Sequence, residues 1–334
     1  MTTERDYLWD GSGTPDPDVQ RLERLLGPLR ATPPPLRLPG AAPRWTLRSM
    51  LPMLATAAAI VLMVGFAWRT RQATRWDVER LAGTPRIGSS VVAETGRLAA
   101  GDTLTTDAAS RARITISDVG GLVIDTNTNL RLVETRRGSH RLALDRGTLH
   151  AAIYAKPGQF VVDTPSARAT DLGCVYDLTV DDSGGGLLSV TFGWVAFDAN
   201  GRESFVPAGA SCRTTPEAGP GTPRYDDAAP ELQEALQRFD FGPRAGRAEA
   251  LRAVLAHTRR RDAVTLWHLL SRVDAADRPA VFAALAARVP PPAGVTREKA
   301  LALDKAALDA WWNALGLGDI NFWRGWKRPL PSVQ

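Results

Sequence analysis

One uncharged, apolar stretch near the N-terminus, residues 49–68, constrains this chain more than any other feature. As an α-helix its 20 residues would be about 30 Å long, which matches the hydrocarbon thickness of a bilayer. A buried globular helix of that length usually carries a polar anchor, and a signal peptide would not follow 48 polar, proline-rich residues. Interfacial aromatics and basic residues flank the stretch: Arg44, Trp45, Arg48, Trp68, Arg69 and Arg71. We therefore predict one transmembrane helix at 49–68.

The charges beside this segment leave its orientation open. The same number of arginines precedes and follows it, so the positive-inside rule gives no direction: Arg30, Arg37, Arg44 and Arg48 before, Arg69, Arg71, Arg75 and Arg80 after. Both cysteines lie on the C-terminal side, which suits an oxidising compartment there.

Residues 1–30 contain one short amphipathic helix. Asp16 is a suitable N-cap, Pro17 fits the first helical position, and Asp18 favours the positive end of the helix dipole. Apolar residues follow at helical spacing: Val19, Leu22, Leu26 and Leu29. A lone helix this short is marginal in water, so this face either binds a partner or belongs to a frayed segment ahead of the anchor. The proline-rich residues 31–48 predict a semi-rigid linker.

From about residue 87 to residue 212 the hydrophobic period changes to two. Ile114 and Ile116 alternate with polar residues, and turn-forming residues recur about every 8–12 positions. This pattern predicts an all-β domain, as a β-sandwich, a roll or a twisted β-solenoid.

Beyond a loop-like linker at 213–230 the period becomes 3.6. Apolar residues at this spacing predict five helices within 231–316, marked by Leu232 to Phe239, Leu251 to Thr258, Val264 to Val273, Val281 to Val289 with Asp277 as cap, and Thr296 to Leu315. Short connections favour a small helical bundle or HEAT-like hairpins, in which Trp311 and Trp312 would pack. Residues 317–334 form an aromatic and basic tail. The fold class is therefore α+β and multidomain.

No residue pattern indicates an enzyme. The histidines have no metal-ligand spacing on one element, and the chain has no CxxC, HExxH, GxSxG or Walker sequence. The acids in or beside the predicted strands are expected to face solvent: Asp163, Asp171, Asp177 and Asp181. The net charge of +5 comes without a basic block carrying interleaved aromatics, which argues against nucleic acid. We expect no catalytic, cofactor or metal site.

The chain has two cysteines, Cys174 and Cys212. Alternation places Cys174 on one strand face with Leu172 and Tyr176, which turns its thiol toward the core and makes it a poor nucleophile. If the two cysteine strands are neighbours in an oxidising compartment, a disulfide would stabilise the fold by about 3–4 kcal/mol. Otherwise the cysteines are independent buried thiols.

Seven short segments, taken in order, resemble the FecR domain, the extracytoplasmic sensor region of bacterial transmembrane anti-sigma regulators. They are 100–106 (AGDTLTT), 127–130 (NTNL), 144–147 (LDRG), 160–167 (FVVDTPSA), 172–176 (LGCVY), 190–195 (VTFGWV) and 208–209 (AG). Cys174 stands where the family usually has threonine.

The resemblance implies a single-pass inner-membrane protein with a cytoplasmic N-terminus and a periplasmic C-terminal region. That location favours a disulfide between Cys174 and Cys212. The family also implies sensing of an envelope signal, from an outer-membrane receptor or another envelope protein, and control of an extracytoplasmic-function sigma factor. The helix carrying Val19, Leu22, Leu26 and Leu29 is then the candidate sigma-binding element. The short cytoplasmic segment and the helical C-terminal region depart from the family, so a membrane-anchored periplasmic scaffold for protein or glycan is the alternative.

Overall fold

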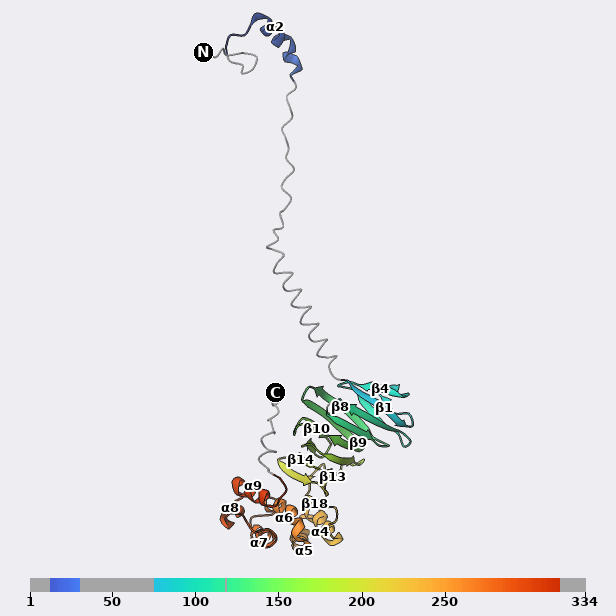
Figure 1. Ribbon diagram of the computed structural model, residues 1–334, viewed down its shortest axis with the longest axis vertical. Helices are drawn as coiled ribbons and strands as arrows, with labels where there is room; N and C mark the ends of the chain where they lie inside the picture. Colours follow the sequence, from blue (N-terminus) through green and yellow to red (C-terminus); the bar gives the residue numbers. More distant parts are fainter. Residues whose placement is uncertain (1–12, 31–74, 118, 319–334) are drawn as a thin grey trace. The chain divides into compact units, whose positions relative to one another are not determined.

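The computed structural model describes residues 13–30, 75–117 and 119–318 (Figure 1). The chain divides into two compact units, residues 1–66 and residues 67–334. Within the first unit the described residues form helix α2 (Pro17–Leu26) and the 3₁₀ turn η1 (Gly27–Leu29). The predicted transmembrane segment at 49–68 lies outside the described residues. Among those that are described, no helix combines the length and apolarity needed to cross a membrane.

The second unit begins with a β region. Its strands are β1 (Trp76–Ala82), β2 (Arg86–Ile87), β3 (Ser90–Val91), β4 (Thr95–Leu98), β5 (Thr103–Thr105), β6 (Arg111–Ile116), β7 (Gly120–Ile124), β8 (Asn129–Arg136), β9 (Ser139–Ile153), β10 (Phe160–Asp163), β11 (Arg168–Asp171), β12 (Val175–Val180), β13 (Gly186–Phe192), β14 (Trp194–Ala199), β15 (Arg202–Pro207), β16 (Ala210–Thr215), β17 (Gly219–Pro220) and β18 (Arg224–Tyr225).

These strands form two sheets that share the long strand β9. The first sheet runs β4–β1–β6–β7–β9–β12–β13–β16, with β17 and β18 both beside β16. The second runs β3–β2–β5–β8–β9–β10–β11–β14–β15. All of these pairs are antiparallel except β9 with β10. The predicted all-β region followed by helices is therefore confirmed.

Strand β9 changes sheets at Gly147. Residues before this position pair with β8, whereas Gly147 and the residues after it pair with β12. Gly147 has a φ of +96°, and a Cβ there would lie within 2.6 Å of three atoms of Thr128. Only glycine allows that backbone geometry and that close approach, so this residue fixes the bend.

The apolar faces of the two sheets pack against each other. The Trp76 ring of β1 lies 6.4 Å from the Phe160 ring of β10, and its Nε1 donates to Thr135 Oγ1 of β8. The β region thus begins at Trp76, earlier than the predicted residue 87. The outward-facing charges of β1, such as Arg80, resemble a membrane flank in the sequence and conceal its alternation.

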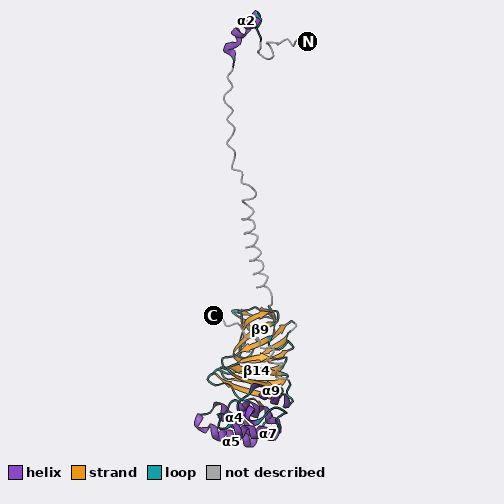
Figure 2. Ribbon diagram, turned by 90° about the vertical axis from the view of Figure 1, so that its left-hand side faces the viewer, coloured by secondary structure: helices purple, strands orange, loops and turns teal. Residues whose placement is uncertain are grey.

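The helical region follows the strands and gathers at one end of them (Figure 2). It comprises α4 (Pro230–Phe241), η2 (Arg244–Gly246), α5 (Arg247–His257), η3 (Arg260–Asp262), α6 (Ala263–Leu270), α7 (Arg278–Arg288), α8 (Arg297–Leu301) and α9 (Lys305–Ala314). Every residue of α6 is buried, as expected for a helix that other elements surround on all sides.

The structure divides the fifth predicted helix into α8 and α9. Leu303 adopts a φ of +58°, which a helix does not tolerate, and Asp304 caps α9 by accepting from Ala307 N at 2.8 Å. The apolar spacing continues through this break, so periodicity alone predicts one helix.

The stretch 213–230, predicted from its composition as a linker, contains the end of β16 and both short strands β17 and β18. Thr215 pairs with Gly219, and Ala210 with Tyr225. Thr214 and Thr222 are buried here. The turn-rich composition predicts local loops. In the structure this stretch is instead fixed because β17 and β18 pair with β16, which belongs to the first sheet.

Candidate functional site

Helix α2 begins with the cap that its sequence predicts. The Asp16 side chain accepts from Asp18 N at 2.9 Å, and the Asp16 carbonyl accepts from Gln20 N at the same distance. Pro17 occupies the first helical position, where its missing N–H costs nothing. The helix start is therefore encoded locally.

The apolar face of α2 is open to solvent. No residue of the helix is buried, and the exposed fractions of its large side chains are 56% for Leu22, 69% for Leu25, 53% for Leu26 and 77% for Leu29. Val19 is half-buried. Leu25 belongs to the same face at spacings of three and four residues, and sequence reasoning missed it. The structure thus brings the predicted partner-binding residues together on one surface.

The disulfide predicted between Cys174 and Cys212 is wrong, because both cysteines are free. Strand β13 lies between them: Val175, next to Cys174, pairs with Phe192, whereas Cys212 pairs with Leu188. Two strand spacings amount to about 9.6 Å, which exceeds the ~7 Å Cα separation that a disulfide allows. Both thiols are inward-facing and buried, as alternation predicts for Cys174.

The prediction that the acids in or beside the strands face solvent is wrong for Asp171. It is 1% exposed, and its carboxylate accepts from Cys174 Sγ and Gly173 N, both at 2.6 Å. Burial raises the pKa of Asp171 to about 7, and these two hydrogen bonds oppose that rise. Gly173, with a φ of +87°, makes the turn that folds the carboxylate back toward the thiol.

The chemistry available to these cysteines is limited by burial. Desolvation, followed by the nearby Asp171 carboxylate, raises the pKa of Cys174 far above its ordinary value. Desolvation likewise raises the pKa of Cys212 to about 12. Thiols held protonated in this way are poor nucleophiles. Within the described residues, no three His, Cys, Asp or Glu side chains gather as a metal site would require.

Both cysteines are expected to resist alkylation in the native protein. Iodoacetamide should label Cys174 and Cys212 only after denaturation, without prior reduction, because the thiols are buried and unpaired. Mass spectrometry of the non-reduced peptides measures this. A linked Cys174–Cys212 peptide in freshly purified protein would contradict the strand order described above.

The helical region covers the outer edge of the second sheet, a role that the sequence does not reveal. The backbone N–H of Phe205 in β15 donates to His268 Nε2 at 3.0 Å, and Arg272 Nη2 donates to the Glu203 carbonyl at 3.0 Å. Side chains from the α6 segment thus replace a neighbouring strand at this edge. Trp311 and Trp312 are both fully buried, as expected, but Trp312 also packs against Trp194 and Phe205 of the strands and not within the helices alone.

Comparison with known proteins identifies the β region. Two crystal structures of a "putative anti-sigma factor" from Parabacteroides distasonis resemble the chain at 17% sequence identity and a TM-score of 0.33. The likeness covers 40% of this chain and 64% of that one, so it spans less than two thirds of that protein. None of the curated proteins matches the chain. The family model of the FecR protein matches residues 102–196, which run from β5 to β14. Residues 102–196 therefore match the FecR family.

Proposed function

We propose that this protein is a membrane-anchored regulator whose FecR domain senses an envelope signal and whose helix α2 binds a sigma factor. The observation that carries the proposal is an open apolar helix face in a chain that also holds a FecR domain. A helix with exposed leucines at this spacing suits insertion into a hydrophobic groove of a partner. The FecR match supports a sigma factor as that partner.

The proposed topology places α2 in the cytoplasm, the apolar stretch 49–68 in the inner membrane, and the β and helical regions in the periplasm. The length and flanking residues of that stretch support a single crossing. The signal would then come from an outer-membrane receptor or another envelope protein. Trp311 and Trp312 are buried, so neither ring is available to bind protein or glycan as a scaffold would.

Charging the apolar face of α2 is expected to abolish sigma binding. The double variant L22D/L26D should lower retention of an extracytoplasmic-function sigma factor by the full-length protein at least about tenfold, because each buried leucine contributes roughly 1.5–3 kcal/mol. Co-purification from the source cells, with the partner identified by mass spectrometry, measures retention, and transcript profiling measures the output.

A matched control lies on the opposite face of the same helix. Q20D/R24Q changes the net charge by the same amount as L22D/L26D, and both of its side chains lie away from the leucines. It should retain the sigma factor. If L22D/L26D and the wild type give equal retention and equal transcripts, or no sigma factor is retained by either, the proposed function fails.

A further inference from the structure

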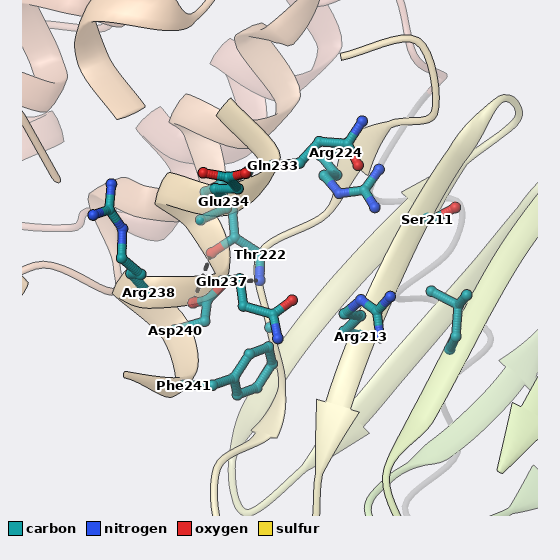
Figure 3. Close-up of a pocket in the computed structure, with 13 residues that line it drawn as sticks. Ser211, Arg213, Thr222, Arg224, Gln233, Glu234, Gln237, Arg238, Asp240 and Phe241 are labelled. Carbon is teal, nitrogen blue, oxygen red and sulfur yellow. Dashed lines mark hydrogen bonds between the residues drawn. The ribbon is translucent and has the colours of Figure 1, made fainter. Parts of the chain in front are cut away.

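A pocket of about 450 Å³ opens where the β region meets the helical region. Strand β16 and the segment through β18 form one side of it, and helix α4 forms the other. Figure 3 shows Arg213 and Arg224 on the strand side and Gln237 and Phe241 on the helix side. A volume of this size accommodates a small organic molecule.

Two guanidinium groups on the strand side have no carboxylate in direct contact. Among the ion pairs of the described residues, neither Arg213 nor Arg224 has a partner within 4 Å. Burial lowers the pKa of Arg224, Arg213 lowers it further, and Asp226 opposes the shift. Arg224 is half-buried and Arg213 is exposed, and the two positive charges repel each other at the mouth of the pocket.

The acidic groups around the pocket are largely occupied by other partners. Asp240 pairs with Arg202 at 2.6 Å and accepts from Thr222 N at 2.6 Å. Asp226 accepts from Ser211 Oγ, and Asp181 accepts from Ser183 N at 2.8 Å in its own turn. Glu234 of α4 is the other carboxylate in the lining.

The rest of the lining favours a ligand with an apolar part. Leu187 of β13, Leu236 of α4 and the ring of Phe241 contribute apolar surface. Gln233 Nε2 donates to the Ala228 carbonyl at 2.8 Å. The side-chain oxygen of Gln233 is then left to accept from a donor group of the ligand. Two arginines beside an apolar surface are suited to an anionic group attached to a hydrocarbon body, because guanidinium groups bind carboxylate and phosphate oxygens bidentately.

We infer that this pocket binds a small organic anion, a carboxylate or phosphate ester with an apolar body, through Arg213 and Arg224. Such a ligand would contact both β16 of the β region and α4 of the helical region. The inference does not depend on sigma binding by α2.

Isothermal titration calorimetry on the full-length protein in detergent tests the site. The probes are phenyl phosphate and benzoate, with benzyl alcohol as the neutral analogue and inorganic phosphate as the anion without an apolar body. Saturable binding is expected for phenyl phosphate or benzoate, weaker binding for inorganic phosphate, and none for benzyl alcohol. If inorganic phosphate binds as tightly as both aromatic anions, the apolar part of the inference is wrong.

Variants assign the binding to the two arginines. R213Q and R224Q should each weaken binding about tenfold or more, because each removes a charge-assisted contact. R252Q, which removes one positive charge from an exposed position on α5, should leave affinity unchanged, and E234Q should strengthen binding. Thermal unfolding of each variant shows whether it folds. The inference is overturned if neither aromatic anion binds, or if folded R213Q and R224Q both bind with wild-type affinity.

Discussion

Replacing Trp312 by alanine is expected to reduce the free energy of unfolding by about 3–5 kcal/mol, the largest loss among the changes considered for this protein. Trp312 is fully buried in α9. Its ring lies 4.8 Å from Trp267 of α6, 5.6 Å from Phe205 of β15 and 5.8 Å from Trp194 of β14. Removing the ring leaves a cavity at the point where helices and strands meet.

The position of this cavity predicts the order in which the helical region and the strands unfold. Because Trp312 contacts both strands and helices, W312A should detach the helical region before the strands unfold. Urea unfolding followed by circular dichroism at helix and strand wavelengths measures the loss and tests whether the two transitions separate. W312F keeps an aromatic ring in the cluster and should lose much less stability. A loss below about 1 kcal/mol for W312A would show that the cluster relaxes around the cavity.

The second large effect is a pH dependence that originates at His268. Its Nε2 accepts from Phe205 N, and its Nδ1–H donates to the Val264 carbonyl at 2.8 Å, so the ring must be neutral. Desolvation, followed by the charges of Arg272 and Arg202, lowers the pKa of His268 well below its ordinary 6.5, and the Val264 carbonyl opposes this. Protonation would remove the acceptor that Phe205 N needs.

The sign of this effect follows from proton linkage. In the unfolded chain His268 takes up a proton near pH 6.5, whereas in the folded protein it does so only at lower pH. Its contribution to stability is therefore complete above about pH 6.5, and below that it falls by about 1.4 kcal/mol per pH unit until the folded-state pKa is reached. The glutamine of the H268Q variant would still present an oxygen to Phe205 N but would not titrate.

The difference in the free energy of unfolding between the wild type and H268Q isolates the contribution of His268. Asp171 acts in the opposite direction, because its pKa of about 7 in the folded protein makes acidification stabilising from about pH 7 down to the ordinary value of 3.8. That contribution is shared by both proteins and cancels if the two sites act independently. Urea unfolding at several values between about pH 5 and pH 8 should show the wild type losing stability relative to H268Q as pH falls. Parallel curves would mean that His268 does not titrate in this range.

Local periodicity predicted the character of most elements. Alternation identified the strand of Tyr176 and turned Cys174 inward, and the residues Asp16 and Pro17 marked the start of α2. These signals work because strand geometry and helix capping depend on residues that are close in sequence. The FecR resemblance of the β region was also readable from short segments taken in order.

Other features depended on which distant elements meet. Spacing in the sequence could not show that β13 separates Cys174 from Cys212, or that a backward turn at Gly173 buries Asp171. The break at Leu303 leaves the apolar spacing intact and is visible only in its backbone conformation.

The sequence by itself determined the succession of elements in this protein: a capped amphipathic helix, strands of period two and then helices. Only the tertiary structure decided how they combine, with β9 shared between two sheets, His268 covering the edge of β15, and Arg213 and Arg224 brought to one pocket. The physical reason is that side-chain period follows from local backbone geometry, whereas pairing, burial and electrostatic environment follow from contacts between residues far apart in the chain.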